Sequence, residues 1–492
     1  MAQSGRLARH ASIVLMLTVC AAAAATAQTM AAFIVPSFAP SGFTLPTSSA
    51  QNPVYGSITN APATAIPVKL SLTDAVNRGL QFNLALEEQQ QVQRESAGQK
   101  LSAFNALMPD LSVQAQTGTQ SIYLPAMGIS PGLFASFHLP PGAVPTLVKV
   151  DVTGAQINVN QPLFNMESIE LYHAAKATIR VAELNTLNTR GDVVMHVSSA
   201  YLQTLAAESQ LQQEQALLRA DATAYDQAKQ KHAAGVATRL DELRGQVQYQ
   251  EQEQAVVRAE NSLAKDRIAL NRMIGLAADQ PVELTDITPF SELTMLSLDE
   301  AKATAYARRK DYLALQAQLS AAGMERKAAT YERLPSLSFG GYYGVIGATH
   351  GLYHGVFTAA GSLNIPIFHE AQFRGDREAA DAQLNRLHAQ VADLQATIES
   401  QLRASMLDVQ ATSALVKVGR SNVDLAQQEL QDSSDRFAAG IEDNLPLVQA
   451  QATLASAQTQ MVDALYQYNQ AKLNLARVTG VIELQYTAYL GQ

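Results

Sequence analysis

An internal duplication constrains the fold of this chain more than any other feature, because a repeated sequence predicts a repeated structural unit. The pattern Leu-Ser-Leu-x-x-Ala occurs at residues 70–75 and returns 226 residues later, at residues 296–301. A proline follows 39 residues after the first leucine of each copy, at Pro109 and Pro335. Further matched landmarks are Pro-Leu-Phe at 162–164 with Pro-Ile-Phe at 366–368, Ala-Ala-Gly at 233–235 with 438–440, and Gly275 with Gly480.

The N-terminus has the features of a secretory signal peptide over residues 1–27. A positively charged start precedes an apolar run that is too short for a bilayer span, and Ala-Thr-Ala ends at Ala27. The mature chain is therefore predicted to begin at Gln28. Cys20 leaves lipidation open as a less favoured alternative, because bulky Val19 precedes it. Without Cys20 the mature chain has no thiol for disulfides or catalysis.

The composition argues against several functional classes. The net charge of −9 disfavours a nucleic-acid partner, because binding to phosphates needs a basic surface. The sequence contains no Gly-Lys phosphate loop, nucleophile elbow or catalytic pair, so neither an enzyme nor a cofactor is predicted. His350 and His354 flank a Gly/Tyr-rich segment and are interpreted as loop residues, not as a metal pair.

Each repeat is predicted to begin with a helix and continue as a β-hairpin. Ser71 with Asp74, and Ser297 with Glu300, resemble capping boxes, and each helix is expected to run to the proline that ends it. Segments of alternating polarity then predict strands at about 110–120, 151–162, 336–346 and 355–366. Such alternation is typical of membrane strands, although it fits a half-buried soluble sheet equally well.

Two long helices in each repeat favour the membrane interpretation. Residues 163–234 contain no proline and would extend about 105 Å as one helix, a length that suits a duct across a periplasm. The last helix repeats large and small apolar residues with coiled-coil spacing. The large ones are Leu447, Leu454, Met461, Tyr468 and Leu475, and the small ones are Ala450, Ala457, Ala464, Ala471 and Val478.

Four strands cannot close a membrane barrel, and open sheet edges are not tolerated in hydrocarbon. If these strands span a bilayer, at least two chains must share one barrel. This argument leaves the number of chains open.

The order and duplication of these motifs resemble the TolC-like outer-membrane factor family over residues 67–482. The helix starts, the Pro-x-Leu-Ser strand entries and the Arg-Phe-Ala-Ala-Gly turn at 436–440 carry the resemblance. The resemblance implies a mainly α fold with a small β part. It also implies a homotrimer in which a 12-stranded membrane β-barrel continues as a periplasmic α-helical barrel. Outer-membrane lipid, a periplasmic adaptor and an inner-membrane pump are the implied partners, and no cofactor is expected.

The resemblance also places the periplasmic aperture at the turns around Gly235 and Gly440. Asp241 keeps an acidic position of the family, whereas Pro446 and Gln449 replace two others. Phe437 stands where the family has a tyrosine that helps to latch the closed aperture.

We hypothesise that other charges at these turns bias the gate instead. Arg239 and Arg244 lie near the first turn, and Glu442 and Asp443 lie near the second. Exposed ion pairs contribute only about 0–1 kcal/mol each, so plain solvated turn charges are the alternative.

The sequence thus predicts a passive outer-membrane conduit for efflux or type I secretion, with its helical part in the periplasm. The alternative is a periplasmic coiled-coil adaptor or scaffold. The predicted parts are an extended segment at 28–66, repeats at 67–290 and 291–484, and a tail at 485–492. The cargo stays open.

Overall fold

The fold is described from a computed structural model over residues 49, 52–58, 62–127, 145–286, 290–439, 441 and 444–491. All of these residues belong to the compact unit Pro46–Gln492. Six residues of interest to the sequence analysis, namely Cys20, Ala27, Gln28, Gly440, Glu442 and Asp443, lie outside the described residues.

The order of elements follows the predicted duplication. The first copy contains η1 (Pro53–Tyr55), β1 (Val68–Leu70), α2 (Leu72–Phe82), α3 (Leu84–Asn105), β2 (Asp110–Tyr123), η2 (Leu124–Met127), β3 (Leu147–Phe164), α5 (Met166–Ala233) and α6 (Arg239–Met273). After β4 (Val282–Leu284), the second contains α7 (Leu298–Arg308), α8 (Lys310–Tyr331), β5 (Ser336–Ala348), β6 (Tyr353–Asn364), α9 (Glu370–Ala438), α10 (Asn444–Val478) and α11 (Ile482–Leu490).

Both predicted capping boxes are present, but the helices that they start are shorter than expected. Ser71 and Ser297 each accept a hydrogen bond from the N–H three residues on, and the acid at that position bonds back to the serine. The prediction of one helix as far as each proline was wrong. The first breaks at Asn83 and the second at Arg309, where the backbone is extended and the helix restarts.

A glycine explains why the chain breaks at these matched positions. Gly275 and Gly480 follow α6 and α10 with φ of 74° and 76°, a conformation that side chains rarely adopt. A Cβ on Gly275 would lie 2.6 Å from Phe82, and one on Gly480 would lie 2.7 Å from the Arg309 nitrogen. Each return helix therefore ends with its glycine packed against a break.

The four predicted strands form one antiparallel sheet in the order β2-β3-β5-β6. They extend beyond the predicted limits, since β2 continues to Tyr123 and β3 starts at Leu147. The two hairpins join through the β3–β5 pair, in which Ile157 lies opposite Tyr343. A separate parallel pair, β1 with β4, ties the start of the first copy to its end.

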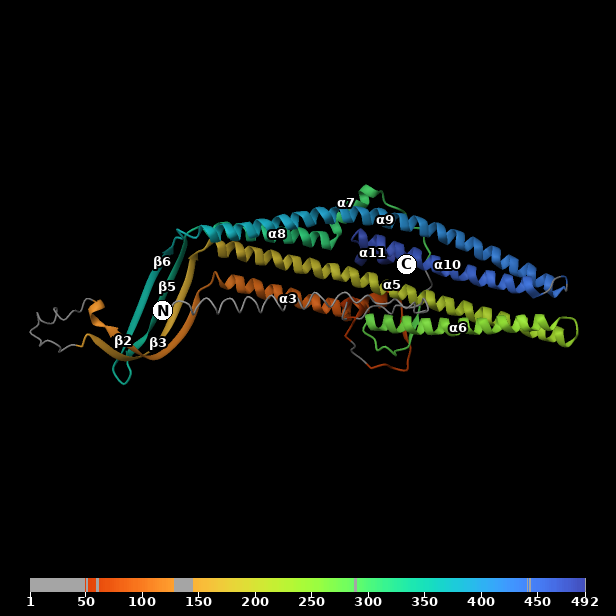
Figure 1. Cartoon of the computed structure of the whole chain (residues 1–492), viewed down its shortest axis with the longest axis horizontal. Helices are drawn as coiled ribbons and strands as arrows, with labels where there is room; N and C mark the ends of the chain where they lie inside the picture. The colour runs from red at the N-terminus through yellow and green to blue at the C-terminus, as the bar shows by residue number, and fades with distance from the viewer. Residues whose placement is uncertain are drawn as a thin grey trace, which may run out of the picture. The chain divides into compact units, whose positions relative to one another are not determined.

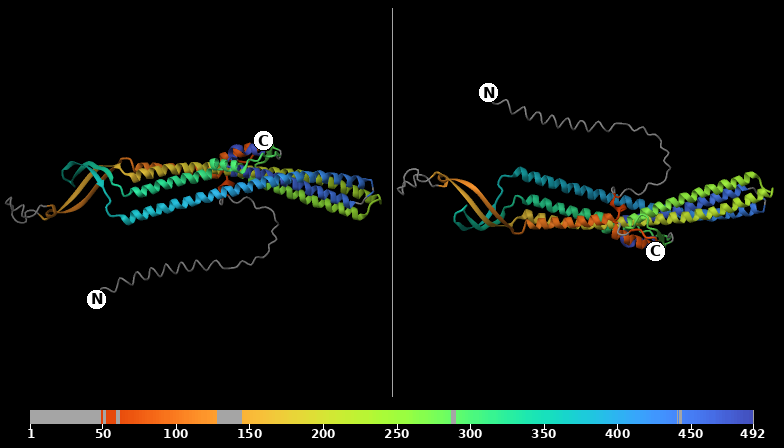
Figure 2. Two further views of the ribbon diagram at one scale, coloured as in Figure 1. Left: turned by 90° about the horizontal axis from the view of Figure 1, so that it is seen from above. Right: turned by 90° about the horizontal axis from the view of Figure 1, so that it is seen from below.

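Within this unit the sheet lies at one end and the turns of the two long helical hairpins lie at the other (Figure 1). Helix α5 has 68 residues and α9 has 69, so both long-helix predictions are confirmed. The two further views show α5 with α6 and α9 with α10 running side by side to these turns (Figure 2). Along the described residues, no helix combines the length and the apolar character that a membrane span requires.

The predicted seam of α10 is confirmed, because nine of its ten residues are buried and Met461 is half-buried. Its partners include Ile398, Leu402 and Val409 of α9. Residues 482–490, expected to belong mostly to a tail, form helix α11. Ile482, Tyr486 and Leu490 recur every four residues along α11 and are buried, which explains why this segment folds onto the core.

Candidate functional site at the hairpin tips

The turn between α5 and α6 is built by one glycine and one capping box. Gly235 has a φ of 77°, and the N–H of Val236 donates to the Lys231 carbonyl at 2.9 Å, which closes the end of α5. Thr238 then caps α6, accepting a hydrogen bond from the Asp241 N–H at 3.2 Å.

This turn gives Asp241 a structural role that the sequence analysis had not assigned. Its Oδ2 accepts hydrogen bonds from the Thr238 hydroxyl at 2.6 Å and from the Thr238 N–H at 3.1 Å. Arg244, three residues further along α6, lies 4.0 Å from Asp241. Arg239 is the first residue of α6, and its side chain is exposed.

The second turn repeats the same closure. The Ile441 N–H donates to the Arg436 carbonyl at 3.0 Å, as Val236 does to Lys231 in the first turn. Pro446 is the third residue of α10, where a missing N–H costs little because the first helical turn has no internal acceptor. Gln449 is exposed on α10.

One side chain joins the two tips. The Lys231 Nζ of α5 lies 3.6 Å from the centre of the Phe437 ring of α9 and donates to the Phe437 carbonyl at 3.2 Å. Phe437 is 8% exposed, so the contact is largely shielded from water. A cation over a shielded ring contributes about 1–2 kcal/mol. Phe437, which lacks the hydroxyl of the family's tyrosine, therefore has a different partner here.

A second polar contact holds the first hairpin together at its tip. The His232 Nδ1 of α5 lies 2.6 Å from a carboxylate oxygen of Glu242 in α6. Lys231, His232 and Glu242 were missed by the sequence analysis. The only available signal was the two cations in the last turn of α5, which are common at helix C-termini for electrostatic reasons alone.

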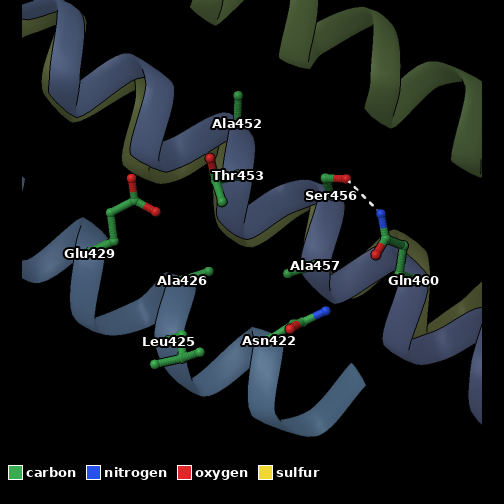
Figure 3. A pocket seen from close by; sticks show the side chains of 9 residues that line it. All are labelled: Asn422, Leu425, Ala426, Glu429, Ala452, Thr453, Ser456, Ala457 and Gln460. Atoms are coloured by element: carbon green, nitrogen blue, oxygen red, sulfur yellow. Dashed lines mark hydrogen bonds between the residues drawn. The ribbon is translucent and has the colours of Figure 1, made fainter. Parts of the chain in front are cut away.

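A shallow groove lies between α9 and α10, further from the tip (Figure 3). Leu425 and Glu429 line it from α9, and Thr453 and Ser456 line it from α10. The Gln460 Nε2 donates to the Ser456 hydroxyl at 3.1 Å along the rim. Leu425 is 59% exposed although it is apolar, so the groove offers both apolar and hydrogen-bonding contacts.

The first hairpin differs from the second in its interior. The seam of α6 contains Gln252 and Asp266, where α10 has Ala457 and Ala471 at positions 205 residues later. On α5, Asp221 stands where α9 has Ala426. These residues were not predicted as functional.

Burial raises the pKa of both carboxyls in this interior to about 6. Asp221 is only 3% exposed, and its sole hydrogen bond between described side chains comes from Gln248 at 3.5 Å. Asp266 is 7% exposed, and Gln203 donates to it at 3.4 Å. Removal from water disfavours the charged form, which is why the pKa rises.

Chemically, the site offers contacts and charges but no reacting group. In the part of the chain that the structure covers, no group of three His, Cys, Asp or Glu side chains could hold a metal ion. The predicted cross-turn pairs of Arg239 and Arg244 with Glu442 and Asp443 stay a hypothesis, because both acids lie outside the described residues.

Comparison with known proteins identifies one family. The family model described as outer membrane efflux protein matches residues 75–276 and 303–481. The two matched segments correspond to the two copies, and the gap between them covers β4 and the start of α7.

Individual relatives are distant. The alkaline protease secretion protein AprF of Pseudomonas aeruginosa is 22% identical over 340 residues, which are 66% of this chain and 69% of that protein. The outer membrane protein TolC of Vibrio cholerae is 23% identical over 80% of this chain and 90% of that protein. The solved CmeC outer membrane channel of Campylobacter jejuni shares the fold, with a TM-score of 0.72 at 13% identity over 90% of this chain and 94% of that one.

Proposed function

Because this chain belongs to the outer membrane efflux protein family, we propose that it is a passive channel subunit of a tripartite efflux or type I secretion system. It would carry substrates from an inner-membrane pump and a periplasmic adaptor to the outside. The pump supplies the energy, so no catalytic step is assigned to this chain.

The observation that carries the proposal is the two-faced sheet. Leu111, Val113, Tyr343 and Phe357 share one face, and Val113 and Phe357 are each 78% exposed. Leaving such side chains in water costs roughly 25 cal/mol per Å² of apolar surface, whereas lipid removes this cost. The opposite face near the helices has Ser112, Gln114, Gln156 and Asn158, which suits a wet interior.

The edges of the sheet support assembly from several copies. Strands β2 and β6 pair on one side only, so each leaves an edge without a strand partner within the described residues. In hydrocarbon an unpaired edge is not tolerated. We infer that β6 of one copy pairs with β2 of the next and that three copies close the sheet, the number that the family resemblance implies.

The helical hairpins would then form the periplasmic part. Their tips would face the pump and adaptor, and the groove between α9 and α10 offers a partner helix both Leu425 and hydrogen-bonding groups. In this arrangement the contact between Lys231 and Phe437 holds the two tips of one copy together and favours a narrow aperture. Arg239, Arg244, Glu442 and Asp443 remain candidates for charge contacts across the same aperture.

The test is the detergent-corrected mass of the full chain extracted from the outer-membrane fraction. We expect the mass of three chains, followed by single-channel conductance in a planar bilayer. A monomer found only in the soluble periplasm would contradict the proposal and would favour the adaptor or scaffold alternative.

A further inference from the structure

A cavity of about 280 Å³ lies at the break between α7 and α8. Three parts of the chain line it: α5 through Asn188 and Gly191, the break through Arg308 and Lys310, and the end of α10 through Arg477 with the following Gly480–Leu484 segment. It is far along the helices from the hairpin tips and takes no part in the site described above (Figure 1).

The lining of this cavity has uncompensated positive charge. Arg477 pairs with Asp192 at 2.6 Å, and Glu483 pairs with Arg190 at 2.7 Å. For Arg308 and Lys310, no carboxylate of the described residues lies within ion-pairing distance. Two cations beside one cavity without acids of their own indicate a site for an anionic group.

The first repeat shows what such a break binds. Its own segment Asn52–Ile58 crosses the break between α2 and α3 as an extended chain. The Ile58 N–H donates to the Phe82 carbonyl at 3.1 Å, and the Leu84 N–H donates to the Gly56 carbonyl at 3.0 Å. Ser57 thereby forms an antiparallel bridge with Asn83. Asn83 adds a side-chain bond from its Nδ2 to the Val54 carbonyl at 2.7 Å.

The second repeat has the same backbone template but leaves it open. Arg309 donates to the Val478 carbonyl at 3.5 Å, as Asn83 does to Met273 at 3.5 Å in the first repeat. Yet among main-chain hydrogen bonds of the described residues outside helices and strands, none reaches the Arg308 carbonyl or starts from the Lys310 N–H.

The side chains beside the template have also changed. Arg308 and Lys310 stand 226 residues after Phe82 and Leu84, so two apolar positions have become cationic. An apolar segment such as Val54–Ile58 suits the first break, whereas the second suits a segment with carboxylates.

We propose that the cavity at the α7–α8 break binds an extended acidic peptide segment of a partner protein. The segment forms a one-residue bridge with the Arg308 carbonyl and the Lys310 N–H, and its carboxylates pair with the two side chains. Residues 1–67 of this chain contain neither Asp nor Glu, so the chain's own leading segment cannot supply these carboxylates.

The test uses the full-length protein in detergent and a fluorescein-labelled seven-residue peptide with three glutamates. The same peptide with three glutamines is the matched probe. By fluorescence anisotropy at low salt, we expect the acidic peptide to bind at least about tenfold more tightly than the glutamine peptide, since two partly shielded ion pairs contribute on this order. The double variant Arg308→Gln with Lys310→Gln should lose this preference.

The control variant Lys176→Gln with Lys327→Gln removes two exposed cations elsewhere and should bind the acidic peptide as the unchanged protein does. Equal binding of both peptides, or equal binding of the acidic peptide by the cavity variant, would overturn the proposal. So would a cavity variant that no longer forms the oligomer of the unchanged protein while neither protein binds peptide. In that case the cavity belongs to an interface between copies.

Discussion

Single side chains at the hairpin tips decide how this chain differs from its family. The resemblance located the tips correctly, and it also indicated that Phe437 has no hydroxyl to offer. What replaces that hydroxyl was beyond the sequence, because Lys231 lies 206 residues away and is one of many surface lysines. Only the fold brings its Nζ to 3.6 Å from the ring.

Lys231→Gln should loosen the aperture. The change removes the cation from the ring, worth about 1 kcal/mol, so the closed-to-open ratio should fall several-fold and mean conductance should rise. Single-channel recording checks this. Lys229→Gln, an exposed lysine two residues earlier, is the matched control. Equal conductance of Lys231→Gln and the control would contradict the latch.

The buried carboxyls make a prediction about pH. Below about pH 4 Asp266 is protonated in the folded and the unfolded chain. As the pH rises towards 6 the unfolded chain releases this proton first, so the folded state loses stability, and the loss is complete above the folded pKa of about 6. Asp266→Ala should therefore stabilise the first hairpin by on the order of 1–3 kcal/mol at pH 7.5.

Thermal unfolding followed by circular dichroism at pH 4.5 and 7.5 measures this effect. The Asp266→Ala variant should show a smaller pH dependence than the unchanged protein. Gln252→Ala, at the other polar position of the same seam, has no proton to release and should leave the pH dependence intact. An undiminished dependence in Asp266→Ala would place the responsible group elsewhere.

At the scale of elements, local rules predicted what local physics controls. Capping boxes, the heptad seam of α10 and the alternation of the strands all appear in the structure because each depends on neighbours in sequence. The breaks at Asn83 and Arg309 were missed, since neither residue stops a helix by itself. They arise from Gly275 and Gly480, almost two hundred residues away.

The glycines predict a graded cost of substitution. Gly480→Ala should destabilise by about 2 kcal/mol or more, because its Cβ would meet the Arg309 backbone in addition to the strain of a φ of 76°. Gly235→Ala has a φ of 77° and open space around it, so only the strain remains, about 1 kcal/mol. Urea unfolding of the two variants compares them; equal losses would mean that packing at the break adds nothing.

Adjacent residues of β6 predict which face of the sheet meets lipid. Phe357 lies opposite Tyr343 on the apolar face, and Thr358 faces the other way. Phe357→Arg should cost about 2–4 kcal/mol if its position is near the middle of the bilayer and should reduce the amount of protein in the outer membrane. Thr358→Arg should be tolerated. Quantitative blotting of membrane fractions checks both, and equal yields would exclude a lipid-facing role for Phe357.

At the scale of the whole molecule, the duplication supplies an internal comparison for every position. It shows the first hairpin to be the more polar of the two and the second break to be the uncovered one. Sequence reasoning found the duplication and its landmarks but could not tell which copy had gained a new property. That answer depends on burial and on empty space, which become visible only when both copies are folded.

The seven-residue seam also limits how the length of such a protein can evolve. Inserting a single residue into α6 or α10 would rotate everything beyond it by about 100° and turn the seam towards water. Lengthening is compatible with packing only in steps of seven residues, made together in both arms of a hairpin and in both repeats, and each step adds about 10.5 Å. The distance that relatives of this chain reach should therefore take discrete values, like the gauge of a modular pipe, matched to the width of the compartment they cross.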